Sequence, residues 1–164
     1  MQLRTLSANQ RGFTLIELLV VIGIITVLFG LASVNLVRPQ NIASVQGATD
    51  TLVADIKNQQ LLSMTGEDGQ TATIQPHGIY MTGTKYSLFA GSAYSAADSN
   101  NFDVVLDAGL ALTTSFASSQ VVFTKGTGAV QSYSGTNNTI AVTNSASGDQ
   151  KTITITRYGA VTVN

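Results

Sequence analysis

The chain has 164 residues, a net charge of −1 and no cysteine, and only 10% of its residues are charged. This slightly acidic balance gives no general attraction to nucleic acid, and the lack of cysteine excludes a fold held together by disulfides. Once a leader and a membrane-length apolar segment at the start of the chain are set aside, the remaining length suffices for one small domain.

A short basic leader begins the chain. Residues 1–12 contain Arg4 and Arg11 and no acidic residue, so the positive-inside rule predicts that this end stays in the cytoplasm. An ordinary secretory signal has its cleavage site after the apolar region. Here the candidate glycine, Gly12, comes before it, and cleavage there would leave the apolar segment on the mature protein. An uncleaved single-pass anchor is the alternative.

A long apolar segment follows the leader. No charged residue occurs from Leu18 to Val37, and at about 1.5 Å per residue this stretch makes a helix about 30 Å long, enough to cross a bilayer. We therefore predict a transmembrane helix over residues 13–37. Glu17 lies just inside its start, where a carboxylate costs about 2.5–3.5 kcal/mol in lipid. It is either an interfacial residue that reaches water or a functional one.

The helix is expected to continue beyond the membrane as an amphipathic segment over residues 38–65. Apolar residues recur there at three- and four-residue steps and predict one stripe that packs on a globular partner. The stripe consists of Ile42, Val45, Ala48, Leu52 and Ile56.

Two residues predict weak points in this long helix, and a glycine turn predicts its end. Gly30 is flexible, and Pro39 lacks an N–H and predicts a kink or local unwinding over residues 35–39. The helix is expected to end near Met64, because the turn sequence Gly66–Gly69 follows.

Beyond the turn, the period changes from helical to alternating. The predicted strands are Thr71–Gln75, Gly78–Thr82, Lys85–Ala90, Phe102–Leu106, Gln120–Thr124, Ala129–Tyr133, Thr139–Thr143, Thr152–Thr156 and Ala160–Val163. Arg157–Gly159 is predicted to form a compact turn into the last strand. The fold class is therefore α+β: a long N-terminal helix packed on an antiparallel β meander, with residues 66–164 as the globular head.

The segment from Arg11 to about Ala32 resembles the prepilin signature of type IV pilins and type II secretion pseudopilins. Gly12, Phe13 and the Thr-Leu-Ile-Glu tetrapeptide ending at Glu17 carry this resemblance together with the uncharged run. It implies that a prepilin peptidase cuts after Gly12 and methylates the new N-terminal Phe13. Glu17 would then be an assembly residue, because its carboxylate and a neighbouring subunit's terminal amine can neutralise one another.

The resemblance also implies a location and partners. The precursor would be anchored in the bacterial inner membrane with its head in the periplasm or outside the cell. It would meet an assembly platform and other pilin or pseudopilin subunits, and it would enter a filament. The protein would be a structural subunit and not an enzyme.

A second resemblance concerns the layout of the head. Val121–Phe123 followed by Gly126 and Gly128, and an Ile-Thr-Ile hairpin with Gly159 at its turn, look like the minor pseudopilin H family. This resemblance favours type II protein secretion. A minor pilin for adhesion, motility or DNA uptake, or a membrane-displayed binding module, is the alternative. Residues 157–161 lack the clustered arginines that phosphate binding needs, so nucleic acid is an unlikely partner.

The sequence offers little catalytic chemistry. His77 is the single histidine and follows a proline in a predicted exposed turn. Oxygen-bearing side chains that could hold calcium gather in one segment: Asp98, Asn100, Asn101, Asp103 and Asp107. The same residue types are common in turns, and the ligand spacing of a calcium-binding hand is missing. We therefore expect no metal or other cofactor, with calcium at Asp98, Asp103 and Asp107 as the open alternative.

Overall fold

The computed structural model describes residues 12–66 and 74–164, and of residues 31–41 it describes the backbone alone. Arg4 and Arg11 of the predicted leader lie outside the described residues. The chain divides into two compact units, Met1–Pro39 and Gln40–Asn164, and the helix α1 (Leu15–Thr65) contributes residues to both.

Local capping explains where α1 begins and ends. The N–H of Glu17 donates to Oγ1 of Thr14 at 3.3 Å, which is the arrangement of a helix N-cap. At the other end, Gly66 has a φ of +72° and its N–H donates to the carbonyl of Leu62 at 2.8 Å. A left-handed glycine of this kind stops a helix, so the predicted end near Met64 is confirmed.

Helical backbone continues through Gly30 and Pro39. A bend of the helix axis at either residue stays a prediction. Within the residues whose placement is described, no helix combines the length and the apolar character needed to cross a membrane.

The first sheet contains four antiparallel strands in the order β3-β2-β1-β5. They are β1 (His77–Thr82), β2 (Lys85–Ala90), β3 (Phe102–Val105) and β5 (Gln120–Phe123). In the register of β1, Ile79 lies opposite Leu88 on one side and Val121 on the other. This alternation gives the sheet one apolar face directed at the core.

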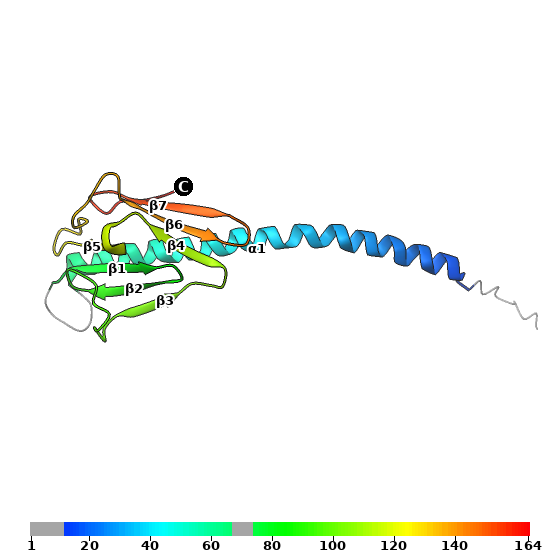
Figure 1. The fold of residues 1–164 in the computed structure, drawn as a ribbon, viewed down its shortest axis with the longest axis horizontal. Helices are drawn as coiled ribbons and strands as arrows, with labels where there is room; N and C mark the ends of the chain where they lie inside the picture. Colours follow the sequence, from blue (N-terminus) through cyan, green and yellow to red (C-terminus); the bar gives the residue numbers. More distant parts are fainter. Residues whose placement is uncertain (1–11, 67–73) are drawn as a thin grey trace, which may run out of the picture. The chain divides into compact units, whose positions relative to one another are not determined.

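The second sheet also contains four antiparallel strands, in the order β4-β6-β7-β8. They are β4 (Leu110–Thr114), β6 (Thr139–Asn144), β7 (Gln150–Ile155) and β8 (Val161–Val163). A short 3-10 helix, η1 (Ala117–Ser119), connects β4 with β5. Figure 1 shows β1, β2 and β3 of the first sheet in green, and β4 of the second sheet in yellow-green beside β6 and β7 in orange.

The strand order corrects the predicted meander. The chain leaves the first sheet for β4, a strand that the sequence analysis did not identify, and returns to the first sheet at β5. The predicted strand at 129–133 is reduced to one bridge between Phe123 and Val130, because Ser132 adopts a left-handed φ of 53° that ends the extended backbone. Of the strand predicted at 71–75, residues 71–73 lie outside the described part, and Ile74 and Gln75 are not in a strand.

The core lies between the sheets and the outer half of α1. Its helical members are Val45, Leu52 and Ile56, each at most 2% exposed. The apolar members from the strands are Ile79, Met81, Tyr86, Leu110, Leu112, Val121, Phe123, Ile140, Val142, Ile153 and Ile155. Removing this much apolar surface from water is the main contribution to the stability of the head, which has no disulfide.

The buried stripe of α1 differs from the predicted one at both ends. Ile42 is 50% exposed and does not join the core. Three polar residues are buried: Thr49 lies within the stripe, and Gln59 and Ser63 extend it toward the helix end. The Thr49 hydroxyl donates to the carbonyl of Val45 at 2.7 Å. Because polar side chains can be satisfied within the helix in this way, apolar periodicity alone does not find them.

Two side-chain contacts hold α1 on the strands and loops of the head. The Tyr86 hydroxyl donates to Asp55 Oδ2 at 2.5 Å. Gln60 Nε2 donates to the carbonyls of Gly128 and Tyr158, at 2.9 Å in each case. The predicted turn at 157–159 is confirmed, and Gly159 has a φ of +79°.

Candidate functional site

The predicted cleavage point lies in irregular backbone just before α1. Gly12 and Phe13 belong to neither a helix nor a strand, and both are exposed. A Cβ placed on Gly12 would meet no atom within 4 Å, so the fold itself does not require glycine there. The Gly12–Phe13 bond therefore lies in exposed, irregular backbone.

The first turn of α1 brings the predicted site residues together. Thr14 is the N-cap, and Glu17 is the third helical residue, so the two form the Ser/Thr-x-x-Glu pattern of a capping box. The helix N-terminus carries a partial positive charge, which favours a carboxylate at Glu17 by about 0.3–1 kcal/mol. Glu17 is exposed and lies four residues after Phe13.

The surface of α1 beyond this turn is apolar. The large apolar side chains, each between 44% and 84% exposed, are Phe13, Leu15, Ile16, Leu18, Leu19, Val20, Val21, Ile22, Ile24, Ile25, Val27, Leu28 and Phe29.

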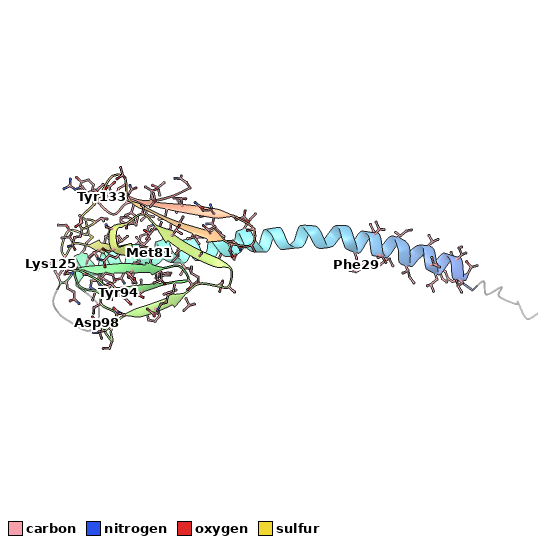
Figure 2. All side chains as sticks on the ribbon, viewed as in Figure 1. Phe29, Met81, Tyr94, Asp98, Lys125 and Tyr133 are labelled. Carbon is pink, nitrogen blue, oxygen red and sulfur yellow. The ribbon has the colours of Figure 1, made fainter. Side chains whose placement is uncertain are left out.

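Such a surface needs another apolar surface against it. Figure 2 shows Phe29 projecting from the helix. Thr26 donates its hydroxyl to the carbonyl of Ile22 at 2.8 Å, which satisfies the one hydroxyl in this segment without water. A helix that is apolar on all sides is stable against lipid or other helices and not in water.

The two residues predicted to kink the helix, Gly30 and Pro39, are separate from this site. Gly30 lies further along α1 with open space around it. Only the backbone of Pro39 is described, and it is the last residue of the first unit.

The oxygen-bearing segment of the head is engaged in local contacts. Asp103 accepts hydrogen bonds from Lys85 Nζ and Ser87 Oγ, both at 2.5 Å. The hydrogen bond from Lys85 lowers the pKa of Asp103, and the same contact raises the pKa of Lys85. Asp98 accepts from the backbone N–H of Asn100 at 3.0 Å.

The expectation of no metal in this segment, with calcium as the alternative, stays a prediction. In the described part of the chain, no three His, Cys, Asp or Glu side chains gather as metal ligands would. The Lys85 ammonium already neutralises Asp103, which is one of the three carboxylates named for calcium.

The prediction for His77 is wrong. The side chain is 3% exposed, and the residue begins β1 opposite Ala90 and Phe123. Because strand pairing on both sides covers this position, the histidine belongs to the interior and not to an exposed turn. The preceding Pro76 suggested a turn, but it only ends the irregular segment before the strand.

Comparison with known proteins finds one family. Residues 7–33 match the prokaryotic N-terminal methylation motif. No curated protein and no solved structure matches the chain. The motif covers the end of the predicted leader, Gly12, Phe13, Glu17 and most of the exposed apolar helix. It implies processing by a prepilin peptidase, an inner-membrane precursor and assembly with pilin subunits. This prepilin-type signal is the one that the precursors of type IV pilins and pseudopilins carry, and the members of that superfamily are structural subunits and not enzymes.

Proposed function

We propose that the chain is a structural subunit of a type II secretion pseudopilus that is cut after Gly12, methylated at Phe13 and assembled through α1. The observation that carries this proposal is the exposed apolar surface of α1, which has one carboxylate, Glu17, near its beginning. Lipid would cover this surface in the precursor over residues 13–37. Apolar helices of neighbouring subunits would cover it in the filament, so assembly need not expose it to water.

Glu17 gives this assembly a direction. Cleavage after Gly12 creates an amine at Phe13, four residues before the carboxylate. Opposite charges about 4 Å apart attract by about 4 kcal/mol at an effective dielectric constant of 20. A subunit whose amine meets the Glu17 of its neighbour neutralises both charges. If the incoming helix sits at another axial position relative to its neighbour, a Glu17 carboxylate stays unpaired in apolar surroundings, which is costly.

Replacing Glu17 by glutamine tests this role. The change removes the charge and keeps the size of the side chain, so we expect normal protein level and normal cleavage but a sharp loss of incorporation into filaments. Crosslinking between helices and shearing of filaments from cells both measure incorporation. Asp50→Asn is the matched control, because Asp50 is an exposed acid on the same helix whose partner is Gln46 at 2.9 Å. Equal incorporation of both variants would contradict the assembly role of Glu17.

Deleting the gene distinguishes a role in secretion from a role in a pilus. In a strain that lacks this chain, the proposal expects exported enzymes to stay in the periplasm while surface pili are unchanged. Loss of pili with normal secretion would instead identify a minor pilin for adhesion, motility or DNA uptake. If both were unchanged, the chain would be a displayed binding module and the filament role would be wrong.

A further inference from the structure

A pocket in the head lies between η1, the loop after β5 and the segment after β2. Its volume is about 180 Å³, and its lining residues are Ser92, Phe116, Ala117, Ser118, Gln120, Val122, Gln131, Ser132, Ser134 and Asn137. This volume is below the roughly 300–1,000 Å³ of pockets for drug-sized ligands. It suits one small ring or the end of a chain.

The chemistry of the lining selects the ligand. Among the described residues that line the pocket, none is charged, and seven carry a hydroxyl or an amide. A hydroxyl both donates and accepts, and an amide offers two donors and an acceptor. Phe116, Ala117 and Val122 add apolar surface. Hydroxyls and amides beside an apolar wall match a neutral sugar, which has hydroxyl groups around its edge and C–H groups on its faces.

Serines with a left-handed backbone conformation line the same pocket. In the described part of the chain, three residues other than glycine have a positive φ: Ser118, Ser119 and Ser132, at 55°, 54° and 53°. Two of them, Ser118 and Ser132, line the pocket. A side chain in this conformation costs free energy that glycine avoids, and such strain gathers at binding sites.

The walls of the pocket are fixed to the first sheet. Gln120 Oε1 accepts from the backbone N–H of Tyr94 at 3.0 Å, which holds the amide and leaves its N–H groups as donors. Tyr94 stacks on Tyr80 with ring centroids 4.1 Å apart, and Figure 2 marks Tyr94 beside the β1–β2 hairpin. Gln131 donates its backbone N–H to the carbonyl of Val122 at 2.8 Å. The Gln120 amide and the backbone at Gln131 are therefore held in place, which favours binding because little conformational freedom is lost there.

We propose that this pocket binds a neutral sugar residue of a surface or secreted glycan. The lining residues named for this pocket all come from the head beyond α1. A single ring held by hydroxyl and amide groups corresponds to millimolar affinity, about 4 kcal/mol. Many subunits in one filament would raise the avidity of such a weak site.

Binding can be measured by saturation-transfer NMR with the full chain in a detergent that contains no sugar. The probes are the methyl glycosides of glucose, galactose, mannose and N-acetylglucosamine, with glucuronic acid and glucose 6-phosphate as charged comparators. We expect at least one neutral glycoside to bind with a dissociation constant of about 1–10 mM. Binding of the charged comparators alone, or of none of the probes at about 10 mM, would overturn the proposal.

Three variants locate the binding. Gln120→Glu keeps the oxygen that accepts from Tyr94 and removes the N–H donors, and we expect it to weaken binding about two- to tenfold. Ser118→Gly and Ser132→Gly remove a hydroxyl, suit the left-handed backbone and should weaken binding by a similar factor while the unfolding temperature stays equal or rises.

Ser119→Gly is the matched control for these glycine variants. Ser119 has the same left-handed conformation but does not line the pocket, so its replacement should leave binding unchanged. If Gln120→Glu and both pocket glycine variants bind as the parent does, the pocket is not the site and the proposal is wrong.

Discussion

Replacing Tyr86 by phenylalanine should weaken the attachment of α1 to the first sheet. Tyr86 is 1% exposed, and its hydroxyl donates to Asp55 Oδ2 at 2.5 Å. A hydrogen bond to a charged group contributes about 1.5–3 kcal/mol, and the variant also leaves the half-buried carboxylate without this donor. For a chain of this size, each kcal/mol shifts the unfolding temperature by about 2–4 °C. We therefore expect a decrease of about 3–12 °C.

Thermal unfolding followed by near-UV circular dichroism measures this decrease. Tyr158→Phe is the matched control, because Tyr158 is 77% exposed. A double-mutant cycle with Asp55→Ala isolates the contact, and a coupling of at least about 0.5 kcal/mol is expected. If Tyr86→Phe lowers the unfolding temperature no more than Tyr158→Phe does, the hydrogen bond does not stabilise the head.

The same contact predicts an alkaline dependence of stability. Burial, and then the hydrogen bond to Asp55, raise the pKa of Tyr86 above the ordinary tyrosine value. A group whose pKa is raised on folding contributes stability below its unfolded pKa and loses it as the pH rises further. The stability difference between the parent and Tyr86→Phe should therefore be full at about pH 8 and narrow above about pH 10. A difference that stays constant to about pH 11 would contradict this cause.

Three further changes test the processing site, the core and the hairpin turn. Gly12→Leu should leave the unprocessed precursor in the membrane. The unfolding temperature should be unchanged, because the fold leaves open space at Gly12. Mass spectrometry of the N-terminus measures cleavage, and normal cleavage would contradict the role of glycine. Leu52 is fully buried, so Leu52→Ala should lower the free energy of unfolding by about 2–5 kcal/mol, measured with denaturant. Leu61 is 55% exposed, so Leu61→Ala should lower it little. Similar losses for both variants would place the core elsewhere. Gly159→Ala should destabilise more than Gly148→Ala, since both have a positive φ but only Gly159 lies against Gln60; equal losses would mean that the Gln60 contact adds nothing.

The sequence predicted the elements of the head better than their arrangement. Period-two alternation located β1, β2 and β7 closely, because their inward residues are large and apolar. The missed strand, β4, has the same signal in Leu110 and Leu112, which are buried while Ala111 is half-buried. Its small neighbours and the preceding Gly109 made it look like a loop. The exchange of β4 and β5 between sheets depends on long-range packing, which local patterns do not encode.

The residues proposed for processing and assembly could be located in the sequence for a different reason. Gly12, Phe13 and Glu17 lie within one short segment, so their spacing in the chain fixes their spacing in space. The proposed sugar pocket was not readable. Its residues come from separate loops, and Ser118 and Ser132 differ from other serines only in backbone conformation. No local pattern of hydropathy or charge marks them.

Because β4 joins the second sheet and β5 returns to the first, the head depends on the strands at the end of the chain. Three of the four strands in the second sheet, β6, β7 and β8, come from the last part of the chain, and β6 is the one that pairs with β4. A chain cut before Thr139 would keep the buried stripe of α1 but lose Ile140, Val142, Ile153 and Ile155, which face it across the core. Such a fragment would retain Gly12, Phe13 and Glu17, the residues proposed for processing and assembly. Its unpaired β4 edge and exposed core would make it prone to aggregation and proteolysis.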